Sequence, residues 1–383
     1  MERKRKKKNP LGQTVFVLFS LLMGVGGGVV ILEYLIAHDG LETGFSDRLP
    51  SVLLFILCLY AAIFLQLILH EAGHLVFGLL SGYRFQSFRI GSFLWLREEG
   101  RLRLRRMSLA GTGGQCLMEP PELRDGKMPY ALYNLGGSLM NLLTALLFFA
   151  IALCLGPGSL PGMLLKLLAV AGLGTALQNG IPLRMGMINN DGYNTLEMRR
   201  DESAIRALWV QLMANSAQAR GQQLKDMPEN WFWQPEEKAM HSALVAAVGY
   251  LACCRLMEQE RLEEAEEQIA GLLEAETGLL DLHRGLMTCD WICCELLGEN
   301  RRERVEMLLT EEQKKLMKAL RKQPTVQRTE VMLALLHDRD STRAEKILTQ
   351  FEKAAKNAPY PAAVESEWVL INRAKAKAQE ERA

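Results

Sequence analysis

Two histidines one helical turn apart, with a glutamate between them, are the residues of this chain with the clearest chemistry. They stand in the run His70-Glu71-Ala72-Gly73-His74. On a helix, residues four apart lie on one face, so both imidazoles can bind a single Zn²⁺. Glu71 then lies where it can take a proton from a zinc-bound water. The pattern predicts a zinc hydrolase site.

The motif lies inside a long apolar stretch, with apolar runs at 52–69 and 75–80 on either side. An ionisable side chain in the middle of a membrane-spanning helix costs about 3 kcal/mol, so three of them need a functional reason. In a soluble helix the same motif is often a coincidence, whereas here that explanation is weak. We therefore predict that the site lies within a membrane.

A catalytic zinc needs a third protein ligand and an open position for water. Asp191 is the candidate, because it follows the last apolar segment at a depth similar to that of His70. Pro182, in the run Asn179-Gly-Ile-Pro182, should end that helix and free the backbone near the metal. The alternative is that Asp191 is an ordinary loop or cap residue.

A fourth candidate is Asn141, in a third apolar segment that begins with Tyr133-Asn-Leu-Gly-Gly-Ser138. The small residues Gly136, Gly137 and Ser138 favour close helix packing. The Asn141 amide either bonds a neighbouring helix or faces the site and stabilises an oxyanion. The sequence leaves both roles open.

Four segments are long and apolar enough to cross a membrane: 14–36, 51–80, 131–155 and 163–183. A basic run at 3–8 precedes the first, and we expect a retained anchor there rather than a cleaved signal peptide. The connection 81–130 is rich in arginine. The positive-inside rule then places both termini in the cytoplasm of a multi-pass cell membrane protein. The arginines of that connection are Arg84, Arg89, Arg97, Arg101, Arg103, Arg105 and Arg106.

The connection 81–130 also contains a predicted β-hairpin, at about 88–106. Alternation from Phe88 to Trp95, a turn at Glu98-Glu99-Gly100 and the run Arg101-Leu-Arg-Leu-Arg105 predict one apolar and one basic face. The arginines could face anionic lipid, and the strand edge could pair with an extended peptide. Beyond it, we expect irregular structure through 111–114 and 119–122.

The C-terminal half, 196–383, is predicted to be a soluble, cytoplasmic α-helical domain, entered after a tryptophan-rich break at 230–235. Similar charged runs occur near 261, 301 and 341. Each run follows a predicted apolar helix and begins the next helix. This period of about forty resembles degenerate tetratricopeptide repeats, with a plain helical bundle as the alternative. Such an array suggests a docking surface for a protein partner. The five cysteines between 253 and 294 should be reduced core thiols.

The remaining composition sets outer limits on function. The 383 residues allow at least two domains, and the net charge of +1 indicates no particular partner. The basic stretches fit lipid and topology rather than nucleic acid, and His38, His241, His283 and His337 lie in packing or surface contexts. The predicted organisation is a basic N-terminus and first span at 1–50, a three-span core at 51–195, and the helical domain at 196–383.

Over about 50–195 the chain resembles the site-2 protease family of intramembrane zinc metalloproteases. Three motifs in the family's order carry the resemblance: His70-Glu71-x-x-His74, Gly136-Gly137 with Asn141, and Asn179-x-x-Pro182 with Asp191-Gly192. The gap between Pro182 and Asp191 is longer than in the commonest form of the third motif.

The resemblance implies an all-α polytopic membrane fold of about four spans with a β-hairpin insertion. It also implies a zinc metalloendopeptidase in which His70, His74 and Asp191 bind Zn²⁺, Glu71 is the general base and Asn141 a possible oxyanion donor. The expected substrate is a membrane-anchored protein or peptide, cut near the cytoplasmic face as in regulated intramembrane proteolysis. Two alternatives stay open, namely an inactive membrane scaffold that acts through its helical domain, and a zinc-handling membrane protein without hydrolysis.

Overall fold

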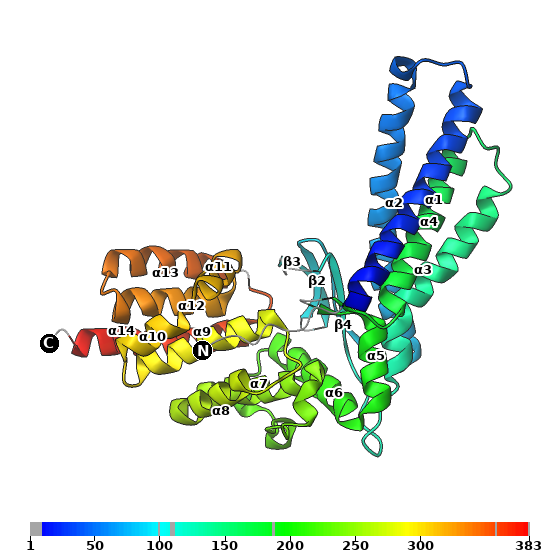
Figure 1. Ribbon diagram of the computed structural model, residues 1–383. Helices are drawn as coiled ribbons and strands as arrows, with labels where there is room; N and C mark the ends of the chain where they lie inside the picture. The colour runs from blue at the N-terminus through cyan, green and yellow to red at the C-terminus, as the bar shows by residue number, and fades with distance from the viewer. Residues whose placement is uncertain (1–9, 99, 108–111, 186–187, 357, 382–383) are drawn as a thin grey trace. The chain divides into compact units, whose positions relative to one another are not determined.

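A computed structural model describes residues 10–98, 100–107, 112–185, 188–356 and 358–381 (Figure 1). The chain divides into two compact units. The first comprises Met1–Ile90, Gly113–Cys116 and Pro129–Arg200, and the second comprises Gly91–Thr112, Leu117–Met128 and Asp201–Ala383. The basic run at 3–8 lies outside the described residues. The three predicted domains stay a prediction, although the last division between the units, after Arg200, falls close to the predicted boundary at 195.

Four long helices form the first unit, and all four are long and apolar enough to cross a membrane. A long apolar helix is found at each of the four predicted spans, and the last one begins and ends three residues before its predicted limits. Ile181 leaves the helix with extended backbone angles, φ −77° and ψ 129°. A residue that precedes proline is forced out of the helical region, so Pro182 ends the helix as predicted. The helices are α1 (Pro10–Asp39), α2 (Phe45–Leu80), α3 (Tyr130–Ala152) and α4 (Leu160–Gly180).

Close packing between α2 and α3 depends on two facing glycines. A Cβ atom on Gly136 would lie 2.7 Å from the carbonyl oxygen of Gly73, which is closer than real atoms approach. The small residues of α3 therefore let the two backbones touch, as the sequence predicted. On the outside of the bundle, leucines such as Leu57 and Leu146 stay mostly exposed. This is the surface expected of helices surrounded by lipid.

A small antiparallel sheet is inserted between α2 and α3. Its strands are β1 (Arg84–Ile90), β2 (Phe93–Glu98), β3 (Arg101–Arg106) and β4 (Gly114–Glu119), in the order β3-β2-β1-β4. The predicted hairpin is confirmed in β2 and β3, which pair from Phe93 with Arg106 to Glu98 with Arg101. Residues 99 and 111 lie outside the described residues.

The prediction of irregular structure through 111–114 and 119–122 was wrong at Gly114 and Glu119, because strand β4 begins at the first and ends at the second. Its residues Gly114, Cys116 and Met118 are buried in alternation. A strand of Gly-Gln-Cys-Leu-Met-Glu contains no β-branched or aromatic residue, so its composition did not signal a strand.

The prediction of one apolar and one basic hairpin face needs a correction. Directly opposite residues of an antiparallel pair point to the same face. The register therefore places Leu104 beside Trp95, and Arg103 beside the buried Leu96. One face is largely apolar, whereas Arg101, Arg103 and Arg105 share the other face with the leucines of β2.

Two short elements and one helix complete the first unit after α4. They are β5 (Arg184–Met185), β6 (Ile188–Asn189) and α5 (Asp191–Arg200). Asp191, predicted to follow the last span, is the first residue of α5.

The C-terminal part of the second unit is helical, as predicted, and its described residues from Asp201 onward hold only helices and connecting segments (Figure 1). Between α6 and α7 the chain forms only 3₁₀ turns, around the predicted tryptophan-rich break. The elements are α6 (Glu202–Ala219), η1 (Leu224–Asp226), η2 (Glu229–Trp231), η3 (Ala239–His241), α7 (Ala243–Glu258), α8 (Leu262–Glu274), α9 (Asp281–Leu297), α10 (Arg302–Leu308), α11 (Glu311–Ala319), α12 (Pro324–Met332), η4 (Leu333–His337), α13 (Ser341–Ala355) and α14 (Pro361–Glu380).

Three helix pairs in this array repeat at intervals of about forty residues. The second helices α8, α10 and α13 open at the predicted charged runs. Each is preceded by a non-glycine residue with positive φ: Glu260 at 61°, Asn300 at 55° and Arg339 at 55°. A left-handed residue closes a helix and turns the chain back. The helix-turn-helix periodicity is thus real, while assignment to tetratricopeptide repeats stays a prediction.

Candidate metal centre

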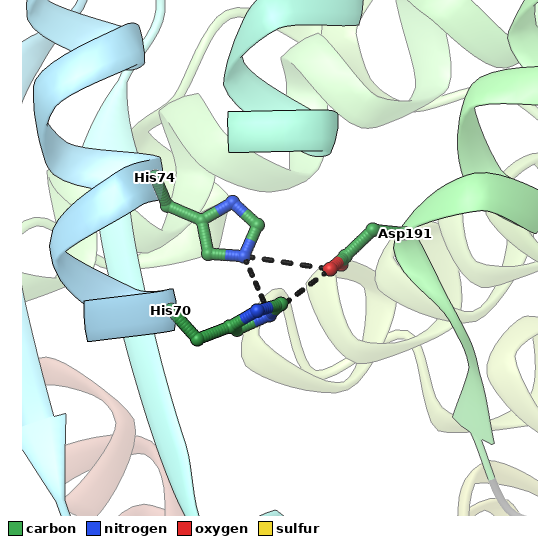
Figure 2. A group of neighbouring side chains, drawn as sticks. All are labelled: His70, His74 and Asp191. Atoms are coloured by element: carbon green, nitrogen blue, oxygen red, sulfur yellow. Dashed lines mark hydrogen bonds and ion pairs between the residues drawn. The ribbon is translucent and has the colours of Figure 1, made fainter. Parts of the chain in front are cut away.

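His70 and His74 on α2 converge with Asp191 at the start of α5, although more than a hundred residues separate them in sequence (Figure 2). Their Nε2 atoms are 3.2 Å apart. The Asp191 Oδ2 atom lies 3.2 Å from Nε2 of His70 and 3.5 Å from Nε2 of His74. The structure therefore brings together the three residues that the sequence proposed as ligands.

These distances fit a zinc ion. Zinc–nitrogen and zinc–oxygen bonds of about 2.0–2.1 Å in a tetrahedron separate neighbouring ligand atoms by about 3.3 Å. All three measured separations are within a few tenths of an ångström of that value. Three protein ligands also leave the fourth position for water or substrate.

The tautomer of His74 is fixed by a backbone carbonyl. Its Nδ1 lies 2.8 Å from the carbonyl oxygen of Tyr133, which can only accept a hydrogen bond. Nδ1 therefore carries the proton, and Nε2 turns a lone pair toward the other two candidate ligands.

A chain of amides fixes His70 in the same way. Gln66 donates through Nε2 to the carbonyl oxygen of Leu168, at 2.9 Å. Its Oε1 and its own carbonyl accept from Asn141 Nδ2, at 2.6 and 2.9 Å. Asn141 Oδ1 is then left to accept from Nδ1 of His70, at 2.7 Å. His70 Nε2 must consequently present its lone pair as well.

Three lone pairs thus face a common point. Asp191 Oδ2 is buried and accepts no hydrogen bond within the described part of the chain. A buried carboxylate oxygen without a donor is costly, and a cation between these atoms would satisfy all three.

Asn190, which the sequence did not single out, holds the start of α5 in place. Its Oδ1 accepts from the backbone amides of Leu183 and Tyr193, at 3.0 and 2.9 Å. Its Nδ2 donates to the carbonyls of Gln178 and Ile181. These four bonds satisfy backbone that Pro182 freed, and they position Asp191 next in the chain.

Glu71 is buried beside the candidate ligands, against the first residue of β4. A Cβ atom on Gly114 would lie 2.6 Å from Oε1 of Glu71. The carbonyl of Gly114 accepts from the buried Arg89, at 3.1 Å. The backbone of β4 at Gly114 therefore packs directly against the Glu71 side chain. The sequence offered no signal for Gly114 or Arg89, because both act through long-range contacts.

Gly137 also makes room for the centre. A Cβ atom there would lie 2.5 Å from Cε1 of His70. The sequence assigned this glycine to helix packing, and the structure shows that the group packed against it is a candidate ligand. His38, predicted as a packing or surface residue, lies elsewhere and stacks on Tyr34.

Comparison with known families adds an independent finding. The model of the family described as Peptidase family M50 matches residues 58–361, which is most of the chain and includes all the candidate site residues. No curated protein and no solved structure matches the chain significantly.

Proposed function

The chain belongs to peptidase family M50, the site-2 protease family, and from this premise we propose that it is an intramembrane zinc metalloprotease. The four apolar helices and the family match make it a membrane protein. The observation that carries the proposal is the convergence of His70, His74 and Asp191 at zinc-ligand separations, beside a buried glutamate. The proposed reaction is hydrolysis of a peptide bond in or next to a substrate's transmembrane segment.

In this proposal His70, His74 and Asp191 hold Zn²⁺, which when bound supplies Lewis acidity toward water and the scissile carbonyl. Glu71 accepts the proton of the attacking water at its carboxylate. It then delivers that proton to the nitrogen of the leaving amine. Its burial keeps other water away from the carboxylate, so the proton stays within the reacting groups.

We assign Asn141 a positioning role and withdraw the oxyanion role suggested by the resemblance. Both hydrogens of its amide nitrogen are directed at Gln66, and its oxygen accepts from His70. No N–H is left to donate to an oxyanion. Asn141 instead holds the His70 imidazole with the correct nitrogen toward the metal.

The proposed topology has both termini in the cytoplasm and the site near the cytoplasmic face. His70 and His74 lie in the last third of α2, and Asp191 follows α4 after a short loop. Both elements approach the face that carries the arginine-rich connection, which the positive-inside rule assigns to the cytoplasm. Water then needs only a short path to the site, and the substrate is cut near its cytoplasmic end.

Peptide capture by strand addition is the proposed way of presenting the substrate as an extended chain. The order β3-β2-β1-β4 makes β3 and β4 the edge strands. The sequence suggested that the edge of the hairpin pairs with the substrate. We favour β4 instead, because its first residue, Gly114, lies against Glu71. A proline scan along β4 should reduce cleavage while zinc content stays normal, and the same scan along β3 is the matched control.

The alternative function is an inactive membrane scaffold that acts through a partner docked on the helical domain. The presence of Glu71 and all three candidate ligands gives no support for a loss of catalysis. Transport of zinc without hydrolysis does not explain a glutamate between the two histidines. Docking of a substrate's soluble part on the helical domain remains compatible with the protease proposal.

The decisive experiment compares membrane peptides and new protein N-termini in cells that carry either the wild type or Glu71→Gln. This substitution removes the base and keeps a side chain of the same size. Products seen only with the wild type, at equal zinc content, would establish proteolysis and locate the cut. Identical profiles with zinc bound in both proteins would favour the scaffold.

A further inference from the structure

The outer face of the β2–β3 hairpin exposes an unusual set of large apolar side chains. Leu102 and Leu104 on β3 are 61% and 58% exposed, and Phe93 on β2 is 45% exposed. The register places Leu104 opposite Trp95, so these four side chains share one face. We call Phe93, Trp95, Leu102 and Leu104 the hairpin patch.

The hairpin does not need this face for its own packing. On the opposite face, Leu94 and Leu96 are buried and pack with Ala219 of the same unit. A sheet with one buried face normally turns polar residues outward on the other. In β3 the leucines point outward instead. Contiguous apolar surface of this kind marks a contact with a partner or a membrane.

The charged side chains that the structure describes on the face of the hairpin patch are positive. Arg97 lies opposite Leu102 on the same face, and the Arg106 guanidinium lies 5.4 Å from the centre of the Phe93 ring. The carboxylate of Glu98 points to the other face, where Arg105 pairs with it at 3.1 Å. Among the described residues of the hairpin, this face carries leucine and aromatic side chains next to arginine and no carboxylate, which is typical of a surface that lies on anionic lipid.

The chain itself keeps this hairpin close to a bilayer. The membrane-spanning helix α2 ends at Leu80, and only three residues separate it from β1. Two more residues, Gly91 and Ser92, separate β1 from β2. A soluble partner would have to be recruited to this face, whereas lipid headgroups are present at the end of α2.

We propose that the hairpin patch docks on the anionic phospholipid surface of the membrane that holds the protein. Leu102 and Leu104 insert between the headgroups, and Arg97 and Arg106 bind the phosphates. Each arginine near an anionic surface favours the docked state by about fivefold. This interaction goes beyond the proposed proteolysis and does not depend on it, so the two can fail separately.

The test uses the full-length protein in vesicles and the fluorescence of Trp95. The contribution of this residue is the difference between the wild type and Trp95→Phe, since the chain has 6 tryptophans. Lipids brominated on the acyl chain quench tryptophans that reach the bilayer. We expect strong quenching in vesicles of phosphatidylglycerol and much weaker quenching in phosphatidylcholine.

Two matched pairs of substitutions separate the parts of the proposal. Leu102→Ser with Leu104→Ser should abolish the quenching of Trp95, and Arg97→Gln with Arg106→Gln should reduce it in phosphatidylglycerol alone. Arg101→Gln with Arg103→Gln, on the opposite face of β3, should leave it unchanged. Circular dichroism and zinc content check that each variant folds.

Three results would overturn the proposal. Absence of quenching in both lipids would show that the face does not touch the bilayer and leave a protein partner as the occupant. Equal quenching in both lipids would remove the anionic recognition. Loss of quenching in the Arg101 and Arg103 control would show that general charge, not this face, is responsible.

Discussion

Replacing Asn141 by alanine tests the hydrogen-bonded chain that orients His70. Asn141 is fully buried, and its Oδ1 accepts from Nδ1 of His70 at 2.7 Å. Alanine removes this acceptor and leaves Gln66 Oε1 without the donor that lies 2.6 Å away. The imidazole can then rotate or change tautomer, so we expect zinc to bind more weakly.

The size of the effect follows from the bonds that are lost. Removing the partner that orients a metal-bound histidine typically lowers metal affinity 10- to 100-fold, which is about 1.4–2.8 kcal/mol. The buried oxygen left on Gln66 costs a further ~1–3 kcal/mol of folding free energy. Both costs are small enough for a folded variant to be purified. Zinc affinity is thus the quantity that should change most clearly.

The assay is competition for zinc with a chromophoric chelator, on purified protein in detergent and in the Glu71→Gln background. Thr144→Ala is the matched control, because this hydroxyl lies one turn further along α3 and bonds its own helix at Met140. Asn141→Asp retains an acceptor for His70 and should recover part of the lost affinity.

The opposite pattern would refute this reasoning. If Asn141→Ala reduced cleavage at least tenfold while the zinc dissociation constant stayed equal to that of Thr144→Ala, the amide would act on the reacting groups. The oxyanion role that the sequence left open would then be correct, and the hydrogen bonds to Gln66 would have to break during the reaction.

Three further predictions concern other parts of the molecule. Gly114→Ala should push the Glu71 carboxylate from its position and reduce cleavage with zinc still bound, whereas Gly24→Ala, whose methyl group meets no atom within 4 Å, should have no effect on either. Arg328→Ala should destabilise the helical unit by about 3–5 kcal/mol in denaturant unfolding without loss of zinc, because it strands two carboxylates that this buried guanidinium pairs. Burial raises the pKa of Glu258, so its contribution to stability is complete below about pH 4 and is lost as the pH rises through the folded-state pKa. Glu258→Gln should therefore make unfolding of the helical unit less pH-dependent above that range, and an unchanged pH profile would contradict this assignment.

The sequence was most informative where a single helix carries the signal. The spacing of His70 and His74, and the apolar lengths of the four spans, are local properties with a fixed physical meaning. Asp191 could be proposed because Pro182 signals the end of a helix at similar depth. These predictions needed no knowledge of which helices touch.

Features that depend on contacts between distant segments could not be predicted in this way. The bond between Asn141 and Gln66 joins two helices whose rotation about their axes is not encoded in any local pattern. The position of β4 could not be predicted for the same reason. Its first residue, Gly114, has no side chain that would signal burial, and its importance comes from its contact with Glu71, which is distant in sequence. The turns at Glu260, Asn300 and Arg339 escaped notice because non-glycine residues rarely adopt positive φ.

The geometry of the centre also bears on the choice between a protease and a scaffold. Three acceptor atoms within 3.5 Å of one another repel, and they lie at the end of an apolar helix where water cannot screen them well. A protein that worked only as a scaffold would be more stable with apolar side chains there. A bound cation reverses this balance, since a ligand at a thousand times its dissociation constant stabilises the folded state by about 4 kcal/mol. Removal of zinc should therefore lower the melting temperature of the wild type and leave His70→Leu unaffected, because that variant has already lost the site. If chelation left the wild type unchanged, the three residues would not hold a structural or catalytic metal, and the scaffold would become the better explanation.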